Sequence, residues 1–149
     1  MELSGYSKIH QIYHREVHWM KGHQVVIQEK IDGSQISFGR KDGVLFIRSK
    51  NRMIDIENPD NMFGCAIAVI KSKTLPGGYV FRGEYLRTPK HNVLNYDRIP
   101  QDHIIIYDIE IRDGSDDYLP PNAVKEIAAD HAFEVVPTLW TGLFDDIDQ

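Results

Sequence analysis

Residues 29–34 have the sequence Glu-Lys-Ile-Asp-Gly-Ser and join two segments that both have the pattern of a β-strand. The apolar run Val-Val-Ile at 25–27 leads into them, and the alternating sequence Gln-Ile-Ser-Phe at 35–38 follows. Such alternation is typical of a half-buried strand, and Asp-Gly favours a tight turn. The sequence therefore predicts that Lys30 lies at the end of one strand, immediately before the chain turns into the next.

A lysine in this position is a candidate nucleophile. A strand end beside a cavity can remove water from the ammonium group, and a desolvated lysine loses its proton more easily. The alternative is a solvated lysine with no chemical role. Residues elsewhere in the chain are needed to decide between these two interpretations of Lys30.

Length and composition are those of an ordinary soluble globular domain. The 149 residues are 42% hydrophobic and 26% charged, which predicts one domain over residues 1–149 with a real core. No apolar run approaches the roughly 18 residues of a membrane span, and residues 1–5 lack the features of a signal peptide. Cys65 is the single cysteine, so no internal disulfide forms. We expect Cys65 to lie in the core and the protein to be cytoplasmic.

The charge is distributed unevenly along the chain. The net charge of −5 argues against binding long nucleic acids by bulk electrostatics. Residues 40–52, however, hold five basic side chains and one acid. This local excess fits a phosphate ligand or a nucleic-acid end. The alternative is a solvated hairpin edge that its charges keep soluble.

The pattern of apolar residues and turns predicts an α+β fold with a mainly antiparallel sheet and flanking helices. Asp42-Gly43 predicts a hairpin turn. Asn58 and Pro59 predict a helix start. We expect helices over residues 7–20, from Asn58 to about Ile70 and from Pro120 to Ala132, and strands over 24–30, 34–40, 43–49, 79–86, 104–112 and 135–136. The run Ile104-Ile105-Ile106-Tyr107 is apolar on both faces, which places its strand inside the sheet.

Three histidines fall on one face of the expected first helix. His10, His14 and His18 are spaced by four residues, and a pair with this spacing can share a metal ion. No carboxylate or cysteine accompanies them in a recognisable ligand motif. We therefore interpret them as a polar face and predict no metal ligands in the chain.

Three segments carry a resemblance to a known family. Residues 29–34 contain Lys-x-Asp-Gly, the adenylation motif of covalent nucleotidyltransferases, and residues 81–86 and 105–110 follow as Phe-Arg-Gly-Glu-Tyr-Leu and Ile-Ile-Tyr-Asp-Ile-Glu. Their order and spacing resemble those of ATP-dependent RNA ligases of the phage T4 RNA ligase 2 group. Residues 85–92 are also similar to phage-type members. The resemblance implies an ATP-grasp-like nucleotidyltransferase core and a bacterial or phage-infected cell as the setting.

The resemblance implies that Lys30 is the catalytic residue. Lys30 would attack the α-phosphate of ATP and hold AMP through a phosphoramidate bond, as the first step of RNA end joining or repair. The attack needs a neutral amine, which partial burial and nearby cations favour. Mg²⁺ would stabilise charge on the leaving pyrophosphate. A DNA ligase or a capping enzyme with the same core is an alternative.

The resemblance also implies a nucleotide-binding set. Glu29 would lie at the adenine edge, Glu84 would accept hydrogen bonds from the ribose or the nucleophile, and Tyr107 would stack on adenine. Within the motif, the set includes Ile31, Asp32, which shapes the turn, and Gly33, which permits close approach of the backbone. The alternatives are a core role for Tyr107 and an ordinary ion pair of Glu84 with Arg82 or Arg87.

A further arginine of the family contacts the nucleotide in a Ser-Arg-Asn context. Here residues 48–51 are Arg-Ser-Lys-Asn. Either Arg48 or Lys50 fits this position, and we prefer Arg48.

Two motifs of the family are absent after Trp140. A Glu-Gly-x-Val-x-Lys motif and a Lys-x-Lys motif would supply a metal-binding glutamate and phosphate-binding lysines. The sequence therefore resembles the N-terminal part of an adenylyltransferase domain, and we expect a C-terminal segment or a partner to supply the rest. We expect weak or no RNA end joining by this chain alone. A non-catalytic or split module that binds nucleotide or RNA is the alternative function.

Overall fold

The structure is a computed structural model that describes residues 2–145 and divides into two compact units. Unit 1 comprises residues 2–6 and 31–135, and unit 2 comprises residues 7–30 and 136–145. The boundary between them in the first half of the chain falls between Lys30 and Ile31, inside the motif that opens the sequence.

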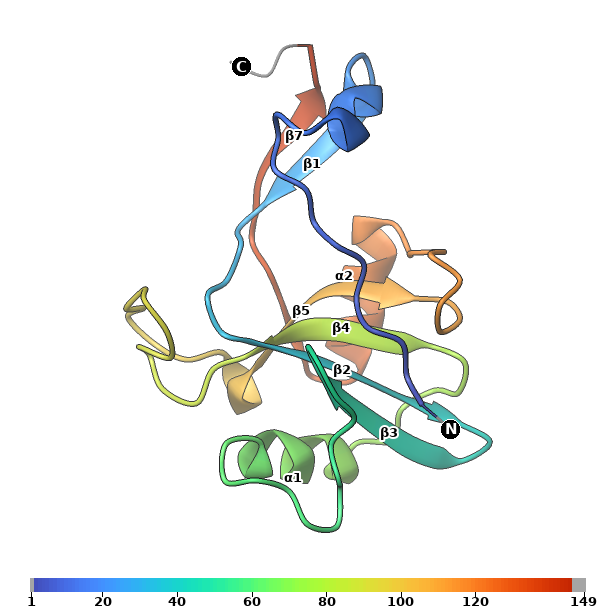
Figure 1. Cartoon of the computed structure of the whole chain (residues 1–149), viewed down its shortest axis with the longest axis vertical. Coiled ribbons are helices and arrows are strands. Elements are labelled where there is room, and N and C mark those ends of the chain that lie inside the picture. The colour runs from blue at the N-terminus through green and yellow to red at the C-terminus, as the bar shows by residue number, and fades with distance from the viewer. Residues whose placement is uncertain (1, 146–149) are drawn as a thin grey trace. The chain divides into compact units, whose positions relative to one another are not determined.

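Unit 1 is built on a five-stranded sheet with the order β3-β2-β4-β5-β6 (Figure 1). All neighbours are antiparallel except β5 and β6, which are parallel. The β2–β3 hairpin turns at Asp42 and Gly43, whose φ angles of 52° and 78° suit the two-residue turn expected from Asp-Gly. The strands are β2 (Ser34–Lys41), β3 (Val44–Ser49), β4 (Val80–Tyr85), β5 (Ile104–Glu110) and β6 (Glu134–Val135).

Both α-helices of unit 1 pack on the same face of this sheet. Helix α1 (Gly64–Ser72) contributes Ala66, Ile67 and Ile70 to the core, and helix α2 (Pro121–Asp130) contributes Val124 and Ala128. They meet the inward side chains of the strands, among them Phe38 and Phe81, whose rings stack at 5.3 Å. The short 3-10 helix η2 (Gln101–His103) precedes β5.

The opposite side of the sheet, which we call the polar face, carries hydrophilic side chains in two rows. Paired residues of an antiparallel ladder present their side chains on the same side. One row runs through Arg48, Ser37, Arg82 and Asp108, and the next contains Gln35 and Glu84.

Residues 2–6 cross the first of these rows. Leu3 accepts a hydrogen bond from Arg48 at 3.1 Å, and the Ser4 carbonyl accepts one from Arg82 at 2.8 Å. Tyr6 then donates its hydroxyl hydrogen to Asp108. The N-terminal segment thus contacts side chains from three strands of unit 1, namely β3, β4 and β5.

Unit 2 contains a two-stranded antiparallel ribbon and a 3-10 helix. The ribbon pairs β1 (Gln24–Gln28) with β7 (Thr138–Leu143), and the helix is η1 (Arg15–Met20). Among the described residues, most of the large exposed apolar side chains belong to this unit, namely Ile9, Ile12, Tyr13, Trp19, Val26, Ile27, Leu139, Trp140 and Leu143. A ribbon of two strands with its apolar side chains exposed is only marginally stable.

We therefore expect backbone amides of the β1–β7 ribbon to exchange with solvent far faster than those of β4. Strand β4 is paired on both sides and buried at five of its six residues. Its amides open only with global unfolding, whereas a ribbon without a core opens locally, at least about 100-fold more often. Hydrogen exchange followed by mass spectrometry measures both segments in one sample. Equal protection of the two segments would contradict this expectation.

The α+β class and the mainly antiparallel sheet agree with the prediction, and all six expected strands lie within two residues of their predicted bounds. Strand β7 was not predicted. It is found only through its pairing with β1, 110 residues or more earlier in the chain. No helix among residues 2–145 has the length and apolar character needed to cross a bilayer.

Three local predictions were wrong. A helix over residues 7–20 is replaced by η1 alone, because residues 7–14 have no core to pack an apolar helical face against. Helix α1 begins at Gly64 rather than Asn58, after a turn in which Asp60 Oδ1 accepts the Phe63 amide at 3.3 Å. Cys65 is exposed, since it lies on the side of α1 opposite the buried residues.

Candidate functional site

Lys30 lies two residues beyond the end of β1. Its side chain is exposed, and within residues 2–145 no hydrogen bond or ion pair engages its ammonium group. The preceding residue, Glu29, is held to the ribbon by its amide, which donates to the Pro137 carbonyl at 3.0 Å. Ile31 is half-buried and begins the long part of unit 1. The lysine is therefore the last residue of unit 2 before the chain enters the long part of unit 1.

Gly33 and Glu84 come together at the start of β2. The Gly33 amide donates to Glu84 Oε2 at 3.2 Å. A Cβ atom at position 33 would lie 2.5 Å from the Tyr85 carbonyl oxygen, closer than packed atoms allow. The predicted close backbone approach at Gly33 therefore occurs, although its neighbour is strand β4 of the same chain.

Tyr107 lies on β5 where the β4–β5 pairing changes register. Its hydroxyl accepts a hydrogen bond from Gln35 Nε2 at 3.3 Å, and Gln35 is the partner of Glu84 across β2 and β4. Burial and the Glu84 carboxylate raise the pKa of Tyr107 well above its ordinary value. The phenol is therefore neutral at physiological pH and offers an uncharged aromatic surface.

Tyr6 contacts this aromatic group and was not identified from the sequence. Its ring meets the Tyr107 ring edge-on at 5.1 Å, and its hydroxyl donates to Asp108. Burial and the Asp108 charge raise the pKa of Tyr6, and burial also raises the pKa of Asp108. No sequence signal links Tyr6 to residues about 100 positions away, so only the fold reveals the contact.

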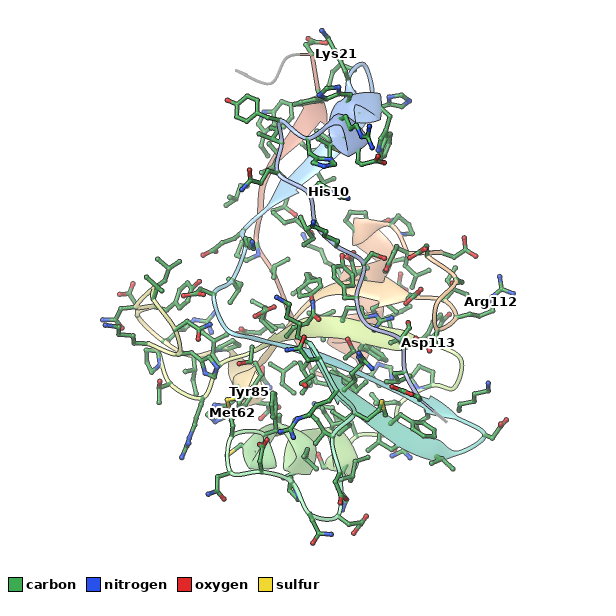
Figure 2. All side chains as sticks on the ribbon, viewed as in Figure 1. His10, Lys21, Met62, Tyr85, Arg112 and Asp113 are labelled. Atoms are coloured by element: carbon green, nitrogen blue, oxygen red, sulfur yellow. The ribbon has the colours of Figure 1, made fainter. Side chains whose placement is uncertain are left out.

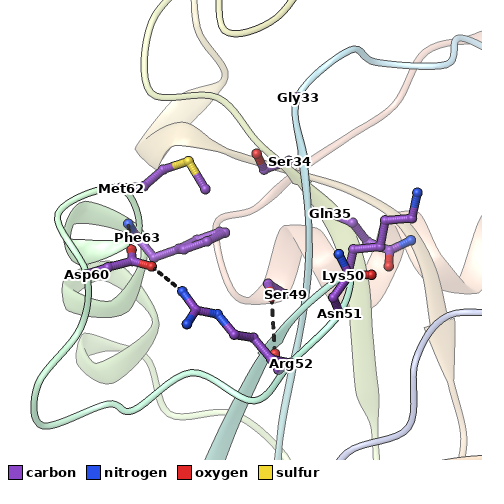
Figure 3. Close-up of a pocket in the computed structure, with 10 residues that line it drawn as sticks. All are labelled: Gly33, Ser34, Gln35, Ser49, Lys50, Asn51, Arg52, Asp60, Met62 and Phe63. Atoms are coloured by element: carbon purple, nitrogen blue, oxygen red, sulfur yellow. Dashed lines mark hydrogen bonds and ion pairs between the residues drawn. The ribbon is translucent and has the colours of Figure 1, made fainter.

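A pocket of about 460 Å³ opens beside the residues that follow Lys30 (Figure 3). Gly33, Ser34 and Gln35 line it together with Lys50. The remaining lining residues are Ser49, Asn51, Arg52, Asp60, Met62 and Phe63. Its volume lies in the range of small-molecule sites.

The charged groups of the pocket differ in how they are engaged. Arg52 is held by Asp60 at 2.7 Å, whereas no ion pair in the described part of the chain engages Lys50 (Figure 3). The Lys50 ammonium is therefore available to an anionic ligand.

Arg48, the preferred residue in the sequence interpretation, points elsewhere. Its guanidinium donates to the Leu3 carbonyl at 3.1 Å and pairs with Glu2 at 3.4 Å. Its side chain is 15% exposed. Arg48 thus ties the N-terminal segment to the polar face, and of the two basic candidates Lys50 alone lines the pocket.

Asp32 holds a loop in place. Its Oδ2 accepts the amides of Val93 and Leu94 at 2.8 and 2.9 Å, and Asn92 donates to its other oxygen at 3.3 Å. The backbone hydrogen bonds from Leu94 and Val93 lower the pKa of Asp32. The stabilisation they give is present above the carboxyl's unfolded pKa and is lost as pH falls through the lower folded value. The contact is therefore complete at neutral pH.

Arg82 is not available to Glu84, because it forms a buried cluster. Its Nη2 lies 2.6 Å from Glu110 Oε2 and 3.3 Å from Asp113 Oδ1, and both Arg82 and Glu110 are 1% exposed. Asp113 follows β5 on the same loop as Arg112, which is 74% exposed (Figure 2). This cluster stabilises the polar face and does not reach the pocket lining.

The structure brings the segments containing Gly33, Glu84 and Tyr107 together through hydrogen bonds, and it places Lys50 in a pocket with Gly33. Glu29 and Lys30 belong to unit 2 and precede this group directly in the chain. Among residues 2–145, no cluster of three or more His, Cys, Asp or Glu side chains suits a metal ion. The predicted three-histidine helix face does not form, although the rings of His10 and His14 stack at 4.3 Å.

A comparison with protein families decides the assignment, because the RNA ligase family model matches residues 23–149. The chain belongs to the RNA ligase family. None of the curated proteins matches its sequence significantly.

Solved structures of an RNA ligase from Naegleria gruberi have a similar fold. This RNA ligase with PPi aligns with a TM-score of 0.65 at 17% identity, over 88% of this chain and 40% of the ligase. A mutant of it without ligand aligns with a TM-score of 0.70 at 16% identity, over 97% and 44%. A mutant with ATP and Mn gives 0.65 at 17% identity, over 88% and 41%. The chain thus spans less than half the length of these ligases.

Proposed function

We propose that this RNA ligase family chain is an adenylyltransferase in which Lys30 attacks the α-phosphorus of ATP. The ammonium group first gives one proton to solvent, and the resulting neutral amine attacks. The Nζ–P bond forms as the bond from the α-phosphorus to the pyrophosphate oxygen breaks, and the nitrogen gives a second proton to solvent or to the leaving pyrophosphate. AMP then remains on Lys30 as a phosphoramidate, ready for transfer to an RNA end. The attack requires the neutral amine, a form that a nearby bound cation would favour.

The observation that carries the proposal is the convergence of three distant segments directly after Lys30. Glu84 reaches the Gly33 amide, and Gln35 reaches the Tyr107 hydroxyl. A carboxylate, a neutral aromatic ring and a pocket lysine that no ion pair in the described residues engages are groups suited to ribose, a base and a phosphate. Glu29 and Ile31 complete the proposed nucleotide-binding set, with Asp32 in a supporting position. Arg48 is left out of the set, because its guanidinium contacts Leu3 and Glu2 instead of the pocket.

The pocket fits a nucleotide better than it fits a metal ion. Lys50 offers a cation to a phosphate, whereas the described residues contain no cluster of metal ligands. Mg²⁺ is commonly held by phosphate oxygens and water with one or two carboxylates, so a nucleotide would bring it. We propose ATP with Mg²⁺ as the pair used; the Naegleria gruberi structures contain ATP or AMP with Mn. The ion would neutralise charge on the leaving pyrophosphate.

We further propose RNA ends as the acceptor of AMP, with a C-terminal segment or a partner supplying additional phosphate-binding groups. Incubation with ATP and Mg²⁺, followed by intact-mass measurement, tests the first step. We expect an AMP adduct on Lys30, located by peptide sequencing, and less with GTP. If no adduct forms even when a polypeptide with the two missing motifs is added, the proposal is wrong.

A second candidate function is a non-catalytic module that binds nucleotide or RNA. The observation in its favour is the exposure of Lys30, whose ammonium no group of the described chain desolvates or engages. ATP binding without an adduct, in the presence of the added polypeptide, would support this alternative.

We expect Lys50→Ala to weaken ATP binding by at least about tenfold, because one charge-assisted contact with phosphate is worth roughly 1.5–3 kcal/mol. Arg48→Ala is the matched control, since its guanidinium contacts Leu3 and Glu2 and not the pocket. It should loosen residues 2–6 and leave ATP affinity within about twofold. Isothermal titration with ATP measures both. The reverse ranking of the two variants would contradict the pocket as the phosphate site.

A further inference from the structure

Residues 87–98, which we call the 87–98 loop, connect β4 with the segment that leads to β5. They contain no helix or strand. Loops of this length inside a compact unit are usually either mobile or functional. The contacts of this loop show that it is held in one conformation.

Hydrogen bonds connect the 87–98 loop to residues 32–34, and side chains of the loop as well as side chains of residues 32–34 take part in them. Besides accepting two loop amides through its carboxylate, Asp32 donates its own amide to the Tyr96 hydroxyl at 2.8 Å. Asn92 Nδ2 donates to the Gly33 carbonyl at 2.7 Å. Ser34 Oγ lies 2.7 Å from His91 Nε2. Three consecutive residues of the nucleophile motif therefore hold the loop.

His91 also joins the two ends of this arrangement. Its Nδ1 accepts the Arg87 amide at 3.1 Å, so its Nε2 carries the hydrogen that is donated to Ser34. Tyr96 is fixed in turn by its amide, which donates to the Pro89 carbonyl at 2.9 Å. With its polar groups used in this way, the loop has a set shape before any partner binds.

The outward side chains of the 87–98 loop are basic and apolar. Arg87 and Lys90 are exposed, and Arg98 is paired with Glu134 at 3.0 Å. The loop contains three cations and one acid, Asp97, in a chain of net charge −5. Val93 is 81% exposed and Leu94 is 52% exposed, although their backbone amides are tightly held.

We propose that the 87–98 loop is a docking surface for the RNA substrate. This inference rests on the proposed function, for which it names the surface that receives the polynucleotide. Exposed cations attract phosphates, and apolar side chains can insert against or between bases. In a protein of net negative charge, a basic and apolar loop beside the nucleophile motif would attract a polyanion to that motif. A surface held rigidly before binding loses less conformational entropy when the RNA binds.

The direct test is RNA binding without ATP or metal, measured by fluorescence anisotropy over a salt series. The probe is a labelled nicked RNA duplex with a 3′-hydroxyl and a 5′-phosphate at the nick. We compare the parent with Arg87→Glu/Lys90→Glu and with Val93→Ser/Leu94→Ser. Lys125→Glu, an exposed charge reversal on α2, is the matched control.

The charge reversals should weaken binding at least about tenfold and lower the slope of log affinity against log salt by about one to two. The serine variants should weaken binding about fivefold to tenfold with an unchanged slope, because they remove apolar contact and no charge. Lys125→Glu should bind within about twofold of the parent.

The proposal is overturned if the parent does not bind the duplex at low salt, or if the loop variants bind as well as the parent. Equal affinity for a DNA duplex of the same sequence would overturn RNA as the occupant. The AMP adduct is formed without RNA, so its yield tests the proposed function separately. If the parent forms the AMP adduct but the loop variants bind RNA as well as the parent does, the docking role of the loop is wrong and the proposed function stands.

The role of Asp32 in positioning the loop can be tested separately, by hydrogen exchange at the loop amides. Asp32→Ala should speed hydrogen exchange at the Val93 and Leu94 amides and weaken RNA binding in parallel. Ser72→Ala, which removes an exposed hydrogen bond at the end of α1, is a control that leaves both amides protected. Unchanged exchange at Val93 and Leu94 in Asp32→Ala would overturn the positioning role.

Discussion

Lys30→Ala should abolish the AMP adduct that the parent protein forms with ATP. The substitution removes the only atom that the proposed reaction joins to phosphorus. It should leave the fold intact, because the Lys30 side chain is exposed and makes no hydrogen bond or ion pair within the described residues. Thermal unfolding should therefore differ little between the parent and the variant, since surface substitutions usually change stability by less than about 0.5 kcal/mol.

Lys30→Arg separates nucleophilicity from charge. A guanidinium stays protonated at any accessible pH, so arginine preserves the positive charge but has no neutral amine. We expect it to be as inactive as Lys30→Ala, while ATP binding is retained. Lys125→Ala, which removes an exposed lysine on α2, should form the adduct at the parent's yield. Intact mass measures all four proteins, and an adduct of undiminished yield on Lys30→Ala would refute the assignment of the nucleophile.

Arg82→Met should destabilise unit 1 by about 3–5 kcal/mol, the usual cost of removing one partner from a buried ion pair. Arg82 is 1% exposed and donates to Glu110, Asp113 and Ser4. Methionine fills similar space without a charge, so the Glu110 carboxylate would remain buried without its main partner. Because a typical domain is stable by only 5–15 kcal/mol, the loss is a large fraction of the total.

Two further variants show whether this loss comes from the buried charge. Arg82→Met/Glu110→Leu should recover part of the stability, because no uncompensated carboxylate remains. Arg112→Met is the matched control on an exposed pair, since Arg112 and Asp117 are 74% and 58% exposed. It should cost no more than about 1 kcal/mol. Urea unfolding measures all of them, and equal losses for Arg82→Met and Arg112→Met would show that the cluster is not important for stability.

The contacts of Arg82 also show why the partners of some site residues could not be predicted from the sequence. Arg82, Glu84 and Arg87 lie close together in sequence, which made an ion pair with Glu84 an open alternative. In the fold, Arg82 reaches Glu110 on the neighbouring strand, and Glu84 reaches the Gly33 amide. Side chains two residues apart on β4 share the polar face, but each finds its partner across the sheet.

The choice between Arg48 and Lys50 has a similar explanation. Both lie in a basic stretch, and Arg48 and Lys50 differ by two positions at the end of β3. Residues 2–6 cross the polar face and engage Arg48, whereas Lys50 lies beyond the last residue of β3, beside the pocket. No local sequence pattern predicts that the N-terminal segment takes this path.

The sequence by itself determined the strands of unit 1, the Asp42-Gly43 turn and the place of Lys30 before the turn into β2. These features depend on the alternation of apolar residues and on turn residues, which act within a few positions along the chain. The resemblance in three ordered segments also pointed to the RNA ligase family before the family match confirmed it.

Only the tertiary structure decided which groups meet. The pairing of β1 with β7, the Tyr6–Asp108 contact and the hold of Asp32 on the 87–98 loop join residues 60 or more positions apart. These contacts depend on strand order and register, which arise from the packing of the whole core rather than from any local preference. Strand order and register determine which of the possible partners each of these side chains meets.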